Sequence, residues 1–236
     1  MSLFYNLKRR ICNMNGKIVF PLWLGFLLFV FSFARDFNSN VHAGGPSPLG
    51  NKMAVIAKEE LKKWKGVTET NSKVSKILRS YWSSVRLKYS EKQLQDPKFQ
   101  ETHPWSSAFI SWVVKEAGAG NQFQYSAAHW RYIAAAKENH VKNKKNPFKA
   151  YRINEVKPQV GDIVCQWRNS KKKATYDNIN APHQTHGDIV VEVTKTKLIT
   201  IGGNVSNTVR ISSVPLNAQG FIAGGRYFAV VKVGEK

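Results

Sequence analysis

The fold of this chain depends most on one stretch, HPWSSAFISWV at residues 103–113. Apolar residues recur at helical spacing after its two serines, and Gly118 follows as a terminator. The pattern predicts a helix that begins at Ser106 or Ser107 and ends at Ala117. Its expected buried face consists of Phe109, Ile110, Trp112, Val113 and Ala117.

The pattern on either side of this helix differs. Helical periodicity also predicts helices over 52–65, 72–87 and 126–138, with a polar loop over 90–104. Runs rich in β-branched and aromatic residues predict strands over 160–167, 189–193, 198–201, 209–214 and 227–233. Helices come first and strands follow, which predicts an α+β domain with an antiparallel sheet.

Composition excludes several classes of protein. The 236 residues are 42% hydrophobic and 12% aromatic, which excludes intrinsic disorder, a collagen-like repeat and a polytopic membrane protein. The chain has two cysteines, Cys12 and Cys165, too few for a disulfide scaffold or a cysteine zinc site. His183, His186 and Asp188 do not have the spacing of a metal site. We therefore expect no metal and no cofactor.

The N-terminal residues have the layout of a secretory signal peptide. Basic residues from Lys8 to Lys17 precede an apolar run over 18–34, and small residues end at Ala43. We expect residues 1–43 to be a cleaved signal or an inner-membrane anchor through residues 18–34, and a buried helix remains an alternative. Residues 44–51 then form a linker, and residues 52–236 form the domain.

The charge indicates the kind of partner. The formal net charge is +21, from 36 Lys and Arg against 15 Asp and Glu. Together with export to the periplasm or cell envelope, this charge favours peptidoglycan, another anionic envelope polymer or a membrane surface over nucleic acid. A generic basic surface without a dedicated partner remains an alternative.

Three segments contain residue types that suit catalysis. Ser106 opens the predicted helix, where free N–H groups favour an anionic nucleophile or oxyanion. His186 starts a strand and is placed to accept a proton, and Asn204 ends the next strand and is placed to orient that histidine. Each has a structural alternative, as a helix cap, a buried histidine and a tight turn.

Several sequence motifs carry a family resemblance. They are LRSYW at 78–82, PWSSAFISW at 104–112, YSAAHW at 125–130, VGDIVC at 160–165, HGDIV at 186–190 and IGGNV at 201–205. From about Ala54 to the C-terminus the chain resembles the DUF2272 family of bacterial proteins. That family is similar in turn to papain-like CHAP and NlpC-type cell-wall amidases and peptidases. The resemblance implies a papain-like fold, with Ser106 at the nucleophile position, His186 as base and Asn204 as the orienting residue.

Ser106 departs from the resembled enzymes, which have cysteine there. A hydroxyl is a much weaker acid than a thiol, so two interpretations stay open. One is a Ser–His–Asn amidase or peptidase acting on peptidoglycan peptides, and the other is an inactive module that binds cell-wall material. A third interpretation of the function is a basic, membrane-anchored assembly protein. Further cleft candidates are Trp105, Ser107, His129 and Asp188, and Cys165 is a rival nucleophile.

Overall fold

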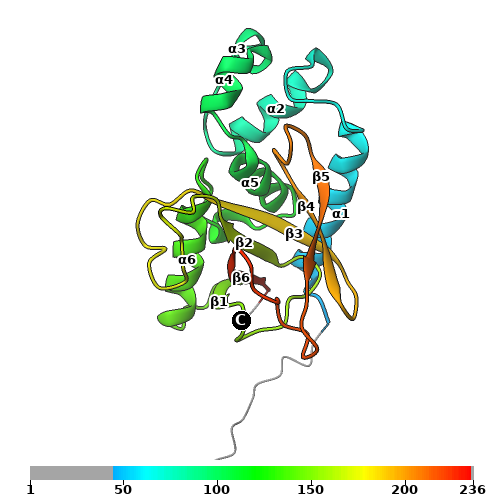
Figure 1. Ribbon diagram of the computed structural model, residues 1–236. Coiled ribbons are helices and arrows are strands. Elements are labelled where there is room, and N and C mark those ends of the chain that lie inside the picture. Colours follow the sequence, from blue (N-terminus) through cyan, green and yellow to red (C-terminus); the bar gives the residue numbers. More distant parts are fainter. Residues whose placement is uncertain (1–44, 235–236) are drawn as a thin grey trace, which may run out of the picture. The chain divides into compact units, whose positions relative to one another are not determined.

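The computed structural model describes residues 45–234 and has the expected α+β architecture, with helices followed by an antiparallel sheet (Figure 1). The signal-peptide prediction for residues 1–43 lies outside the described residues. The helices are α1 Pro48–Trp64, α2 Ser72–Ser84, α3 Glu91–Gln95, α4 Pro97–Thr102, α5 Ser106–Glu116, the 3-10 turn η1 Gly120–Gln122 and α6 His129–Val141. The strands are β1 Phe148–Arg152, β2 Ile163–Trp167, β3 Thr185–Val193, β4 Lys197–Gly202, β5 Arg210–Pro215 and β6 Tyr227–Val233.

Side-chain caps set the start of the early helices and correct two predictions. Ser47 caps α1 by accepting from Gly50 N, and Pro48 occupies the first turn, so the end of the predicted 44–51 linker is helical. The predicted loop at 90–104 is wrong, because it contains α3 and α4. Ser90 opens α3 with a capping box, and Asp96 caps α4. Helices of five and six residues are too short to show apolar periodicity, so only their caps signalled them.

All six strands belong to one antiparallel sheet, in the order β1-β6-β2-β3-β4-β5. The sequence did not predict β1. This strand pairs with β6 from Phe148 opposite Val233 to Arg152 opposite Ala229. Its five residues include Lys149 and Arg152, so it lacks a continuous apolar run. β1 and β5 are the two edges, and β2 and β3 lie at the centre.

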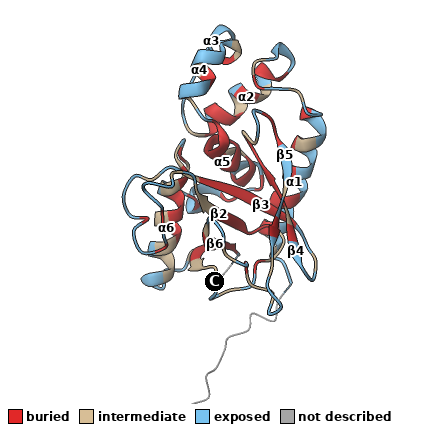
Figure 2. Ribbon diagram, viewed as in Figure 1, coloured by how far each residue is buried: buried red, intermediate tan, exposed pale blue. Residues whose placement is uncertain are grey.

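The two faces of the sheet are covered differently. Helices α1, α5 and α6 pack on one face and enclose the larger core, which includes Ile163, Ile189 and Ile201. The second face has a smaller apolar cluster, made of Val164, Val190, Leu198, Val214, Ile222 and Val230. Figure 2 shows that α5 and the central strands are mostly buried. Within residues 45–234, no helix is long and apolar enough to cross a membrane.

The turn at Gly161 and Asp162, just before β2, contacts both β6 and α1. Asp162 is buried and accepts from Val233 N at 3.0 Å and from Lys232 Nζ at 2.6 Å, which ties the turn to β6. Gly161 has φ +90° and lies against the backbone of Gly50 in α1, so a side chain there has no room. The motif that opens β2 thus fixes the sheet to the first helix.

Candidate functional site

The start of α5 is anchored in the core, and no side chain of the described residues caps its first turn. Trp105 is the N-cap residue and provides no side-chain cap. Its ring is fully buried, stacks on Trp64 at 4.8 Å between centroids and donates from Nε1 to Glu69 Oε2 at 2.7 Å. Trp105 was a cleft candidate, but it lies in the core. Its position fixes where α5 begins and leaves the N–H groups of the first turn without a side-chain acceptor.

Ser106, the first residue of α5, makes a hydrogen bond with a histidine of α6. Its Oγ lies 2.7 Å from Nε2 of His129, the first residue of α6. The other ring nitrogen of His129, Nδ1, lies 2.7 Å from the hydroxyl oxygen of Tyr132. His129 and Tyr132 are three residues apart and therefore lie on one face of the helix. The result is a chain of three polar side chains, Ser106–His129–Tyr132.

The surroundings keep His129 and Tyr132 uncharged. Burial, followed by the nearby positive charges of His186 and Arg168, lowers the pKa of His129 well below its usual 6.5. Burial, together with Cys165 and Asp188, raises the pKa of Tyr132 well above 10. A neutral imidazole next to a serine hydroxyl is the state that a general base requires.

His186 has a different partner from the one expected. Its Nε2 lies 2.9 Å from Oδ1 of Asp188, and both side chains are 1% exposed. Residues alternate across a strand, and Gly187 and Ile189 of β3 point toward the helices. The His186 ring lies beside that of His129, with 5.3 Å between centroids, but no hydrogen bond joins it to Ser106 in the described chain. The predicted pairing of Ser106 with His186 is therefore not formed. His186 Nδ1 is buried and has no hydrogen-bond partner among the described residues.

Two glycines show how close the polar groups come to the sheet. A Cβ at Gly187 would meet the Tyr132 hydroxyl and would lie 3.3 Å from His129 Nδ1. A Cβ at Gly202 in β4 would meet Asp188 Oδ1. Glycine at these two positions therefore lets His129 and Tyr132 approach one face of the sheet, and lets Asp188 fit against β4.

Ser106 and His129 line a pocket of about 420 Å³. Its wall contains no acidic side chain and consists of Pro104, Ser106, Ala127, Ala128, His129, Arg168, His183, Gln184, Thr185, Asn204, Ser206 and Asn207. Asn204 lies in the turn after β4 with φ 55°, where it makes no hydrogen bond to His186 in the described chain. The structure thus brings Ser106 and Asn204 to one pocket, with His129 there instead of His186.

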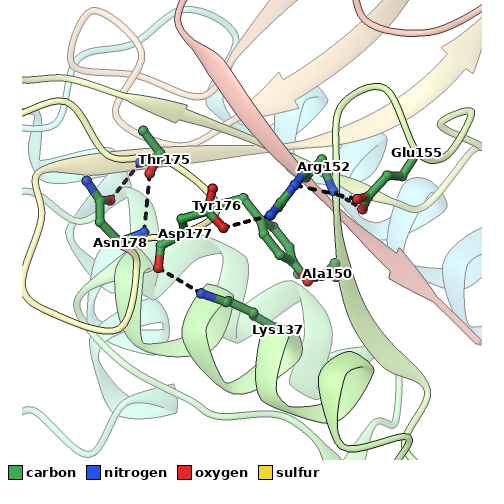
Figure 3. Close-up of polar contacts among 8 residues, drawn as sticks. All are labelled: Lys137, Ala150, Arg152, Glu155, Thr175, Tyr176, Asp177 and Asn178. Atoms are coloured by element: carbon green, nitrogen blue, oxygen red, sulfur yellow. Dashed lines mark hydrogen bonds and ion pairs between the residues drawn. The ribbon is translucent and has the colours of Figure 1, made fainter.

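The two ends of the β2–β3 connection, residues 168–184, line the pocket through Arg168, His183 and Gln184, and the middle of the connection is anchored to other elements (Figure 3). Tyr176 donates to Ala150 O at 3.0 Å, and the Arg152 guanidinium lies over its ring at 4.4 Å. Asp177 pairs with Arg152 at 2.7 Å and accepts from Lys137 Nζ at its carbonyl at 2.9 Å. These contacts fix the middle of the connection to β1 and α6, while Arg168 itself is held by its backbone N–H, which donates to Gln184 O at 2.8 Å.

The remaining candidates lie away from the pocket. Ser107 is 1% exposed and donates to Ser126 O at 2.8 Å, which makes it a structural contact. Cys165 is buried in β2, and burial raises the pKa of its thiol, with Asp188 adding to the effect, so it is a poor nucleophile. Among residues 45–234, no cluster of three His, Cys, Asp or Glu side chains has the arrangement of a metal site.

Comparison with known proteins gives a family without an assigned activity. The model of DUF2272, described as uncharacterized protein conserved in bacteria, matches residues 59–231, which include α2 to α6 and most of the sheet. No curated protein and no solved structure matches the chain. The matched range contains Ser106, His129, Tyr132, His186 and Asn204. On this match, the chain belongs to the DUF2272 family.

Proposed function

We propose that the protein is a serine hydrolase of amide bonds, with Ser106 as nucleophile and His129 as general base. The observation that carries the proposal is the 2.7 Å contact between Ser106 Oγ and His129 Nε2 in the wall of a pocket. A nucleophile and base within hydrogen-bond reach, with a third group on the base, is the arrangement that activates a serine.

In the proposed first step, Ser106 Oγ attacks the substrate carbonyl and its proton passes to His129 Nε2. Before the attack, neutral His129 has its own proton on Nδ1, donated to the Tyr132 hydroxyl oxygen 2.7 Å away. Tyr132 therefore holds the imidazole in the tautomer that accepts at Nε2. The negative charge that forms on the carbonyl oxygen faces the uncapped N–H groups at the start of α5.

In the next step the C–N bond breaks and His129 gives its proton to the leaving nitrogen. Water then attacks the acyl ester on Ser106, again with His129 accepting the proton, and the acid product leaves as Ser106 recovers its proton. Asn204 lines the same pocket and is available to bind the substrate. Each step uses one base, His129, and needs no metal or cofactor.

The proposal extends to the cell envelope and to a papain-like relationship. A nucleophile at the start of a helix packed on an antiparallel sheet supports the likeness to CHAP and NlpC-type enzymes. The signal-like pattern of residues 8–43 and the net charge of +21 support export and an anionic polymer as partner. Peptidoglycan peptides are the substrate that combines these features.

A fluorophosphonate probe tests the nucleophile without knowledge of the substrate. Ser106 Oγ would bond to phosphorus, fluoride would leave, and His129 would take the serine proton. We expect a covalent adduct on Ser106, located by mass spectrometry, and no adduct in Ser106→Ala. The matched control is Ser107→Ala, one residue along the same helix, where the hydroxyl faces Ser126 and labelling should persist.

Absence of labelling in the folded wild type would remove the hydrolase proposal and favour the module that binds cell-wall material. Ser106→Cys then distinguishes the two forms of that alternative. Gain of thiol-dependent hydrolysis of peptidoglycan fragments would indicate a degenerate peptidase, since a thiol is far more acidic than a hydroxyl.

A further inference from the structure

The pocket beside Ser106 is polar, and Arg168 is the one permanently charged side chain among the described residues that line it. Among its lining residues, Arg168, His129 and His183 are basic, and none is acidic. Arg168 follows β2 directly, and its positive charge lies near enough to His129 to lower the pKa of that histidine. A cation in this position is available to an anion bound next to the reacting serine.

The Arg168 guanidinium has no carboxylate partner among residues 45–234. Asp188 acts on Arg168 electrostatically, but no ion pair joins the two side chains in the described chain, and Asp188 Oδ1 contacts His186. Partial burial, with nearby Arg226, lowers the pKa of Arg168, so the protein bears an energetic cost for holding the charge there. An unpaired, partly buried arginine next to a pocket is a common receptor for a carboxylate, which its planar fork binds bidentately.

The same wall has further unsatisfied polar atoms. His183 Nδ1 and Thr185 Oγ1 are buried without a hydrogen-bond partner in the described chain, and both residues line the pocket. Buried polar groups in folded proteins are normally paired, so two unpaired atoms in one wall show that its polar groups are not fully satisfied by the protein. The connection whose ends carry Arg168 and His183 is anchored at its middle by the Tyr176 and Asp177 contacts of Figure 3.

We infer that the substrate carries a carboxylate close to the bond that Ser106 attacks, and that Arg168 binds it. This inference rests on the proposed function and specifies its substrate class as an acidic peptide. Arg168 lies on the wall formed by the β2–β3 connection and Ser106 opens α5, so one ligand in the pocket reaches both.

The test measures binding directly and so does not depend on turnover. N-acetylglycine and its neutral analogue N-acetylglycinamide are titrated into Ser106→Ala at low ionic strength, with ligand and protein NMR signals as the readout. We expect N-acetylglycine to bind about tenfold more tightly or better, which is the usual gain of a charge-assisted contact. Arg168→Gln should remove that difference, and Arg168→Lys should keep part of it.

Arg79→Gln is the matched control, since Arg79 lies exposed on α2 away from the pocket. It should keep the preference for the carboxylate. Equal affinity for the two ligands, no saturable binding of N-acetylglycine, or an equal loss in Arg168→Gln and Arg79→Gln would overturn the inference. Because these outcomes concern binding, they are separate from fluorophosphonate labelling, whose failure would overturn the hydrolase proposal alone.

Discussion

Two buried histidines lie beside each other, with ring centroids 5.3 Å apart, and their hydrogen-bond partners differ. On the face covered by helices, His129 lies between two hydroxyl groups, those of Ser106 and Tyr132. His186, near the start of β3, pairs instead with the carboxylate of Asp188. The hydroxyl partners leave His129 free to accept and return a proton, whereas the buried carboxylate makes His186 part of a structural pair. The hydrogen-bond partners, and not the residue type, therefore decide which of the two histidines can act as a base.

Removal of His186 should have the largest effect on stability. His186→Ala leaves Asp188 buried without its hydrogen-bond partner, and breaking such a pair costs about 3 kcal/mol of unfolding free energy. Urea denaturation measures the loss. The control is His140→Ala, in the last turn of α6, where the half-buried ring contacts Tyr151 and has no buried charged partner in the described chain, so stability should change far less. A small loss of unfolding free energy in His186→Ala would show that the His186–Asp188 pair is not structural.

Substitution of Gly187 and Gly202 should distinguish the roles of the two histidines by the rate of labelling. In Gly187→Ala, the added Cβ meets the Tyr132 hydroxyl, and displacement of the His129 ring should slow fluorophosphonate labelling about 100-fold. Gly202→Ala is its counterpart in β4, where the Cβ meets Asp188. That variant should lose stability but keep its labelling rate at temperatures where it stays folded. Equal losses of labelling rate in the two variants would contradict the assignment of catalysis to His129 and of a structural role to the His186–Asp188 pair.

The pH dependence of labelling reports on His129. Its pKa lies below the 6.5 of an unfolded histidine, so the neutral base persists as the pH falls through 6.5 and is lost only at lower pH. The labelling rate should therefore hold its plateau below pH 6.5. Because the charge of His186 helps to lower this pKa, His186→Ala should move the acid limb to higher pH. If the acid limb of the wild-type labelling rate were centred at or above pH 6.5, His129 would be a solvated base whose pKa is not lowered.

Tyr132→Phe should have the smallest effect. It removes the acceptor for His129 Nδ1 and leaves the ring in place, so the expected loss is about one hydrogen bond, up to roughly tenfold in labelling rate. The stability of the variant, followed by the same denaturation, serves as its control. A rate equal to that of the wild type would mean that Tyr132 does not orient the imidazole.

Much of the fold was predictable because its long elements have clear patterns. The strand at 227–233 and the start of the helix at Ser106 are confirmed at the predicted residues. The elements that were missed, β1, α3 and α4, have five or six residues each, too few for a period to appear. Capping residues mark α3 and α4 in the sequence, whereas the pairing of β1 with β6 becomes evident only after folding.

The candidate site was predictable in its residues but not in its pairings. The sequence singled out Ser106, Asn204 and His129, and the structure places all three on one pocket. It did not show which side of β3 His186 takes, because the apolar residues Ile189, Val190 and Val191 are buried on both faces. With no polar side to β3, alternation fixes the relation of His186 to Asp188 but not to the helices.

The most direct measurement is the rate of fluorophosphonate labelling of Ser106 in His129→Ala and His186→Ala, side by side at pH 8, where His129 is neutral. The account predicts that His129→Ala slows labelling by about 10²- to 10⁴-fold, as expected for loss of a general base. His186→Ala, below its unfolding temperature, should label within a few-fold of the wild-type rate. The reverse order, with His186→Ala unreactive and His129→Ala labelled normally, would contradict the account and restore His186 as the base.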